Sequence, residues 1–324
     1  MQIELFTTTF GLVFAIVLGL LWGSFANVCI YRWPPTDEHP RGRSVVHPGS
    51  HCSACKAPIA WYDNVPLLSY LWLRGKCRAC HAAFSPRYLL VEALTGALFG
   101  VAWWFTLGTG GFYNELNVRA LWFVIDAAFV FVMVVTTFID LDHKLILDKL
   151  MIPSAVVFYA ATFVLPGYQW WEGLVGMAVG WGLPWLVGEI WFRIKKTEGL
   201  GLGDGMLLAV VGALLGWRGV IVALLGGSLT GMVVTLRSLA SPGRVAVAGV
   251  AVAAIAVAGH FGGLVAAGAV LCVALLVLLR SLRAMDSDDA RALLTTEIPF
   301  GPFLALAAIF YLFAAPWIDL RFRL

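Results

Sequence analysis

Long apolar runs are the feature that most constrains what this chain can fold into. They recur at 5–31, 89–108, 119–139, 150–166, 171–192, 205–217, 219–236, 245–258, 262–280 and 299–316. A helix of about 20 apolar residues crosses the hydrocarbon core of a bilayer, and the shorter runs suit half-helices or tilted pieces. Because a backbone in lipid must satisfy its own hydrogen bonds, the runs predict an all-α polytopic membrane protein. The first run is too long for the core of a cleavable signal, so we expect a retained span.

Composition agrees with this fold class and excludes others. Hydrophobic residues make up 60% of the chain and charged residues 13%, against about 25% charged residues in ordinary soluble domains. The net charge of +3 is too small and too dispersed to indicate a nucleic-acid partner. The lipid bilayer is therefore the first partner that the sequence predicts.

Lys and Arg are concentrated in every second loop. They are frequent in 32–88 and recur after the runs that end near 139, 192, 236 and 280, whereas "GTGGFYNELN" and "PGYQWWEG" contain none. Loops rich in Lys and Arg stay in the cytoplasm. We therefore expect these loops on the cytoplasmic side and both termini on the opposite side.

Four cysteines in the segment 32–88 form two CxxC pairs. Cys52 and Cys55 make the first pair, Cys77 and Cys80 the second, and 21 residues lie between the pairs. Such spacing can bring four thiolates to one tetrahedral zinc ion. A site closed by four thiolates has no open position for water, so the predicted role of zinc is structural. His51 and His81 flank the pairs and are alternative ligands or solvent-facing side chains.

Two carboxylates are candidates for catalysis. Asp140 ends the run in "TTFIDLDHKLILDKL", and Asp204 begins another in "EGLGLGDGM". The charge pattern places both on the cytoplasmic face, where they could share a proton and activate water. Gly199, Gly201 and Gly203 would let an extended substrate backbone approach closely.

Other interpretations of the acidic residues stand beside this one. Asp204 could be an ordinary helix N-cap. Asp142 and Asp148 suit interfacial charges. Asp126 lies inside an apolar run, where a carboxylate is either functional or paired structurally.

Five segments in this order resemble the type IV prepilin leader peptidases, which are membrane aspartic peptidases and N-methyltransferases. The quoted matches are "GSFANVCIYRWP" (23–34), the cysteine segment 52–99, "IDLDHKLILD" (139–148), "GLGD" (201–204) and "IPFGPFLALA" (298–307). The resemblance implies that the two catalytic aspartates are Asp140 and Asp204. It implies eight family spans in the bacterial inner membrane. The inserted segment 237–298 would then add about two more.

The resemblance also implies the substrates. These are prepilins or pseudopilins, whose short basic leader would be cut after a glycine on the cytoplasmic side. The new N-terminus would then be methylated with S-adenosylmethionine, an activity that the family associates with its zinc loop. Glu92 is a candidate contact for that cofactor, with an ion pair to Arg87 as the alternative.

The expected organisation is a first span at 1–31, a zinc-binding domain at 32–88, a peptidase core at 89–236, the inserted segment at 237–298 and a last span at 299–324. The chain departs from the family pattern at Leu147, where proline is usual, and at Met206, where lysine is frequent. The inserted segment is the third departure.

Two other functions compete with the peptidase. An ion- or proton-coupled transporter would also use membrane carboxylates and glycine-broken helices. A zinc-binding module without catalysis would explain 32–88 but would give Asp140 and Asp204 no role.

Overall fold

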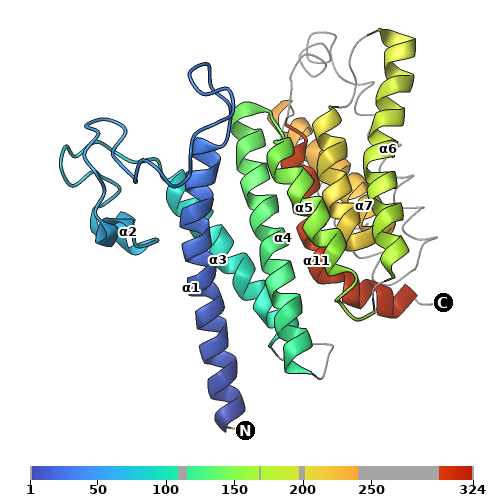
Figure 1. Ribbon diagram of the computed structural model, residues 1–324, viewed down its shortest axis with the longest axis horizontal. Helices are drawn as coiled ribbons and strands as arrows, with labels where there is room; N and C mark the ends of the chain where they lie inside the picture. Colours follow the sequence, from blue (N-terminus) through green and yellow to red (C-terminus); the bar gives the residue numbers. More distant parts are fainter. Residues whose placement is uncertain (1, 109–114, 168, 197–200, 240–298, 323–324) are drawn as a thin grey trace.

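The computed structural model describes residues 2–108, 115–167, 169–196, 201–239 and 299–322. Its long helices are α1 (Gln2–Arg32), α3 (Arg87–Thr106), α4 (Leu116–His143), α5 (Asp148–Ala161), α6 (Trp170–Lys195), α7 (Leu202–Leu239) and α11 (Gly301–Phe322), and they form one bundle (Figure 1). Between α1 and α3 lie only the short helices η1 (Trp61–Asn64) and α2 (Leu68–Trp72). The described ranges contain isolated bridges but no strand. The all-α prediction is therefore confirmed for them.

Eight of the apolar runs correspond to these helices. Five helical stretches are long and apolar enough to cross a membrane: Thr9–Arg32, Arg87–Thr106, Leu116–His143, Trp170–Ile194 and Leu202–Met232. The stretch Gly301–Ala315 is apolar but shorter. The chain is thus a multi-pass membrane protein. The runs 245–258 and 262–280 lie outside the described residues.

Helix α7 is broken near the end of the run 205–217, two residues before the boundary with the run 219–236. Gly216 has φ 65° and ψ −175°, so its backbone leaves the helical conformation. Positive φ is readily available only to glycine. The chain therefore turns at Gly216 into a second helical piece.

Helix α4 is the centre of the bundle. It packs against α1, α3, α5 and α11, and its middle contains the fully buried side chains of Phe129, Val130, Met133 and Val135. An apolar surface on every side suits a helix surrounded by other helices. Its last turn, which contains Asp140, is consequently held in place from several directions.

Helices α6 and α7 approach each other through glycines. A Cβ atom at Gly212 would lie 2.2 Å from the carbonyl carbon of Gly176, and one at Gly180 would lie 2.3 Å from the carbonyl oxygen of Leu208. Small residues let helix backbones touch where lipid gives no hydrophobic driving force. This contact fixes the first piece of α7 against α6.

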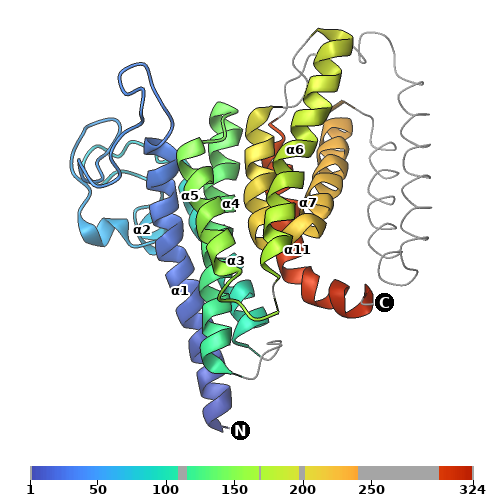
Figure 2. The ribbon, with the colours of Figure 1, turned by 45° about the vertical axis from the view of Figure 1, so that its right-hand side comes forward.

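One end of the bundle gathers the ends of α1 and α4 and the starts of α3, α5, α7 and α11. We call it the aspartate end. Arg87 at the start of α3 contacts Asp142 at the end of α4, and Gly203 at the start of α7 approaches Ile146 in the loop between α4 and α5. Residues 32–88, which we call the cysteine module, project from the same end (Figures 1 and 2).

Candidate functional site

Asp140 lies in the last turn of α4 and is only 6% exposed. Its Oδ2 atom accepts a hydrogen bond of 3.0 Å from the backbone N–H of Gly301, the first residue of α11. The first N–H groups of a helix have no partner within the helix and carry a partial positive charge. The start of α11 is therefore a favourable place for a carboxylate.

Asp204 is half-buried near the start of α7. It is the third residue of that helix rather than the residue before it, so the N-cap interpretation is wrong. It lies at the same end of the bundle as Asp140, because the preceding Gly203 approaches Ile146 in the loop that follows α4. Gly201 leaves room beside it, because a Cβ atom there would come no closer than 3.6 Å to Oδ2 of Asp204.

The sequence reasoning missed Gly301. A Cβ atom on this residue would lie 2.6 Å from Oδ2 of Asp140, so only glycine allows the observed approach. Pro302 follows it, and proline is common in the first turn of helices. The Gly-Pro pair in "IPFGPFLALA" therefore indicates the start of a helix, whose free N–H groups can bind an anion.

The other acidic candidates lie apart from this pair. Asp142 is exposed and pairs with Arg87, and Asp148 is exposed at the start of α5. Asp126 is buried in the middle of α4, and its Oδ1 atom has no hydrogen-bond partner in the part of the chain that the structure describes. The structural pairing considered for Asp126 therefore gains no support there.

The two departures near the site are accommodated locally. Leu147 precedes α5 with φ −88° and ψ 115°, an extended conformation, and its side chain is buried. Met206 packs partly buried against the main core. A lysine is thus replaced by an apolar contact in the first turn of α7.

The four predicted cysteines come together in the cysteine module. The Sγ atoms of Cys52 and Cys80 are 3.8 Å apart, those of Cys55 and Cys77 are 3.9 Å apart, and all four lie within 4.8 Å of one another. The four thiols could hold one metal ion. His51 and His81 are not part of this cluster, and the ring of His51 interacts instead with the carbonyl of Gly49.

The two CxxC segments have matching backbones. The backbone N–H of Lys56 donates to the carbonyl of Cys52, and the backbone N–H of His81 donates to the carbonyl of Cys77. The φ angle is 59° at both Lys56 and His81. The N–H groups of Cys55 and Ala54 lower the pKa of Cys52 to about 6. The first turn therefore stabilises a thiolate, which is the form of cysteine that binds metal.

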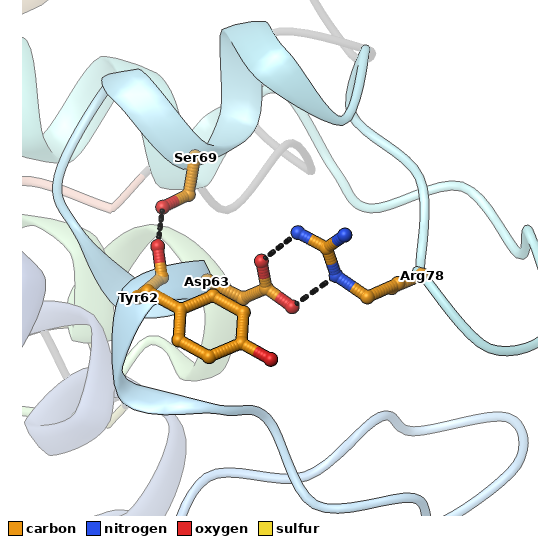
Figure 3. A network of polar contacts seen from close by, with 4 residues as sticks. All are labelled: Tyr62, Asp63, Ser69 and Arg78. Carbon is orange, nitrogen blue, oxygen red and sulfur yellow. Dashed lines mark hydrogen bonds and ion pairs between the residues drawn. The ribbon is translucent and has the colours of Figure 1, made fainter.

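An ion pair links the second CxxC segment to η1 (Figure 3). The guanidinium of Arg78 donates two hydrogen bonds to Asp63, of 2.7 Å and 2.5 Å, and lies 5.5 Å from the ring centroid of Tyr62. Ser69 in α2 donates to the carbonyl of Tyr62. The pair with Arg78 lowers the pKa of Asp63. The metal cluster, η1 and α2 thus form one connected unit.

Glu92 is the point where this unit meets the bundle. It is buried in the second turn of α3, and its Oε2 atom accepts a hydrogen bond of 2.8 Å from the N–H of Leu67, just before α2. Arg87 contacts Asp142 and the carbonyl of Phe138 instead. The suggested ion pair between Glu92 and Arg87 is therefore wrong.

A cavity of about 420 Å³ lies beside Glu92, between α1, α3 and the cysteine module. Its lining includes Asn27 and Tyr31 from α1, Tyr88 and Glu92 from α3, and Tyr70 and Phe84 from the module. Ligand cavities in proteins have volumes of about 300–1,000 Å³. The bundle and the module therefore enclose enough space for a small molecule, apart from the aspartate pair.

Comparison with known proteins identifies two matching families. The bacterial peptidase A24 N-terminal domain matches residues 17–106, and the type IV leader peptidase family matches residues 127–236. The first match contains the four cysteines and Glu92, and the second contains Asp140 and Asp204. No solved structure is significantly similar to the chain.

Several curated relatives have the same name, prepilin leader peptidase/N-methyltransferase. The one from Myxococcus xanthus (strain DK1622) is 35% identical over 323 residues, which cover 95% of this chain and 91% of the relative. The one from Neisseria gonorrhoeae is 34% identical and covers 72% of this chain and 85% of the relative. The one from Aeromonas hydrophila is 37% identical, with 68% and 78% covered.

Proposed function

Because the chain belongs to the type IV leader peptidase family, we propose that it removes the leader of prepilins and then methylates the new N-terminus. Its substrates are pilin-like precursors with a short basic leader, a glycine and an apolar helix. The enzyme acts in the bacterial inner membrane, with the aspartate end on the cytoplasmic side. The Lys and Arg residues of the cysteine module and of the loops at this end support that orientation.

The observation that carries the peptidase proposal is the placement of Asp140 and Asp204 at one end of the bundle, where Gly301 donates to Asp140 and Gly203, next to Asp204, approaches Ile146 in the loop after α4. In the proposed mechanism the two carboxyl groups share one proton and titrate as a pair. The ionised partner takes a proton from water, and the water oxygen attacks the glycine carbonyl. The protonated partner donates a hydrogen bond to that carbonyl oxygen and stabilises its developing negative charge. Collapse of the tetrahedral intermediate breaks the C–N bond, and the leaving amine takes up a proton.

The start of α11 has a positioning role in this mechanism. The N–H of Gly301 fixes one oxygen of Asp140, and the other oxygen is then directed by the geometry of the carboxyl group. Correct orientation of reacting groups supplies a large share of catalysis. Gly201 keeps the surroundings of Asp204 open for a substrate backbone, while Gly203 lets the start of α7 approach Ile146.

The cavity beside Glu92 is the proposed site of methyl transfer. S-adenosylmethionine supplies an electrophilic methyl group when it is bound. Its cationic sulfur and amine suit a site with a buried carboxylate and several aromatic rings, and Glu92, Tyr31, Tyr70 and Tyr88 provide them. Glu92 would bind the cofactor by charge, and the aromatic rings would contact it.

The metal of the cysteine module is proposed to be structural zinc. In a tetrahedral site with Zn–S distances of about 2.3 Å, sulfur atoms are about 3.8 Å apart. The pairs Cys52–Cys80 and Cys55–Cys77, at 3.8 Å and 3.9 Å, fit this geometry, and all four sulfur atoms lie within 4.8 Å of one another. With four thiolate ligands the ion has no free position, so it would hold the module in shape beside Glu92.

The comparisons give no support to the transporter alternative. The position of the aspartate pair also argues against it, because transporter sites usually lie near the middle of the membrane. A module that only binds zinc would leave the aspartate pair unused.

The deciding experiment is cleavage of a purified prepilin by the purified enzyme in detergent. Asp140→Asn and Asp204→Asn should each reduce the rate by about 10³-fold or more, because a shared proton needs both carboxyl groups. Asp148→Asn, at an exposed acid of the same end, is the matched control and should stay close to wild type. Wild-type cleavage by either of the first two variants would refute the assignment. Methylation of a precleaved pilin, compared between wild type and Glu92→Gln, tests the second site separately.

A further inference from the structure

Helix α2 presents its apolar side chains outward. Leu68, Leu71 and Trp72 follow one another at helical spacing, and they are 67%, 64% and 82% exposed. Trp61 in η1 is also 82% exposed. The opposite side of α2 faces the protein, where Ser69 and Tyr70 donate hydrogen bonds to backbone carbonyls. The outward face, which we call the α2 face, consists of Trp61, Leu68, Leu71 and Trp72.

The position of α2 along the bundle indicates what covers this face. Leu67, just before α2, donates to Glu92, and Glu92 lies five residues into α3, about 7.5 Å from its start at 1.5 Å per residue. Even with the Glu92 side chain directed back toward the helix start, α2 is held beside the first turns of α3. Both views place α2 next to the bundle and level with the ends of α1 and α3 rather than beyond them (Figures 1 and 2).

The α2 face also continues the lipid-facing surface of the bundle. Helix α3 is one of the candidate membrane spans, and Leu90 and Leu94 are exposed along its first two turns. A short apolar helix beside the end of a span occupies the boundary between headgroups and acyl chains. Tryptophan is enriched at that depth because its ring is apolar and its N–H is polar.

The charges around the face complement a lipid surface. Arg74 and Lys76 directly follow α2 and are exposed, and residues 64–91 contain no acidic residue. Basic side chains near a membrane are attracted to anionic headgroups by about 1 kcal/mol each. Lys76 also lines the cavity beside Glu92, whereas Arg74 does not.

From these observations we infer that α2 is an interfacial helix. The cysteine module lies on the membrane surface, with Trp61, Leu68, Leu71 and Trp72 inserted among the lipid headgroups. The bilayer thereby acts as a third wall that holds the module against α3. This proposal does not depend on the peptidase or methyltransferase assignment.

Photo-crosslinking in nanodiscs of phosphatidylglycerol and phosphatidylethanolamine tests this placement. Trp72→p-benzoyl-L-phenylalanine in the full-length protein should give lipid adducts, detected by mass spectrometry. The same replacement at Glu38, in the turn beyond the end of α1, is the control and should give about tenfold fewer. Equal yields at both positions would overturn the inference. A Trp72 adduct with added prepilin in place of lipid would do so too, because the face would then bind substrate.

Fluorescence quenching by brominated lipids gives a second measurement without an unnatural residue. Trp72→Phe should reduce the quenching of tryptophan fluorescence. The reduction should be larger for lipids with bromine near the headgroup than for lipids with bromine deep in the acyl chain. Trp103→Phe removes a buried tryptophan of α3 and should leave the quenching unchanged. Equal effects of the two variants would contradict an interfacial α2.

Discussion

Gly301→Ala tests the contact that holds Asp140. The added Cβ atom would lie 2.6 Å from Oδ2 and 3.2 Å from Cγ of Asp140. An ordinary contact between carbon and oxygen is about 3.3 Å or more, so the carboxylate must move by roughly 0.7 Å. The hydrogen bond of 3.0 Å from the N–H of Gly301 would be lost or stretched. The substitution therefore displaces a catalytic oxygen without changing its chemistry.

Two lines of reasoning give the size of the effect. A misplacement of about 1 Å can cost about 10²-fold in rate. A lost hydrogen bond to a charged group costs about 1.5–3 kcal/mol, and each 1.4 kcal/mol corresponds to about tenfold. We therefore expect kcat for prepilin cleavage to fall by about 10- to 100-fold. KM should change less, because the residue does not contact the apolar part of the substrate.

The assay needs a control for the added methyl group and for folding. Gly182→Ala adds the same group to α6, where a Cβ atom meets nothing within 4 Å, and should cleave like wild type. Metal content and melting temperature of both variants should match wild type. A Gly301→Ala enzyme that is folded and has wild-type kcat would refute the positioning role of the start of α11.

Three further predictions concern the surroundings of the site. Arg87→Lys should reduce cleavage by up to about tenfold, because lysine cannot replace both hydrogen bonds of the guanidinium; Arg74→Lys, at an exposed position, is the control for the kinetic assay. Chelation of the metal should abolish methylation but spare cleavage. The cysteine module lines the cavity, whereas the aspartate pair lies outside the module. Loss of both activities would contradict separate sites. Asp63→Asn should increase hydrogen exchange of residues 61–72 at pH 7, with unchanged metal content. Because the folded-state pKa of Asp63 is lowered, its stabilising contribution is present above about pH 4. The wild type should approach the variant as the pH falls below that value, and exchange that is independent of pH would argue against the ion pair.

The sequence was sufficient where the signal is local. Apolar runs predict spans because a backbone in lipid must satisfy its own hydrogen bonds. The break in α7 at Gly216 falls two residues before the boundary between two of these runs. The CxxC spacing predicts the metal cluster because each CxxC turn holds its two thiolates close together, and two such turns supply the four ligands of one metal ion. The basic loops and the two acidic motifs together predict which helix ends meet.

Contacts between distant segments were beyond such reasoning. Gly301 and Asp140 are separated by 161 positions, and Leu67 and Glu92 by 25. Which atoms meet in such pairs depends on the register of one helix against another, and that register is decided by packing rather than by local preference. The expectation that Glu92 pairs with Arg87 failed for this reason. The two are near in sequence but on different sides of α3.

The register that brings Gly301 to Asp140 originates in α7. A Cβ atom at Gly227, in the second piece of α7, would lie 3.1 Å from the backbone nitrogen of Leu304, and one at Gly231 would lie 3.2 Å from the ring of Phe303. These close approaches fix the first turn of α11 and hence the N–H of Gly301, from which Asp140 accepts a hydrogen bond. The second piece can return to the aspartate end only because the chain reverses at Gly216, where φ is positive. The first piece of α7 carries Asp204. The second piece packs against the first turn of α11 and so positions the N–H of Gly301 that binds Asp140. One broken helix therefore contributes to the placement of both carboxylates.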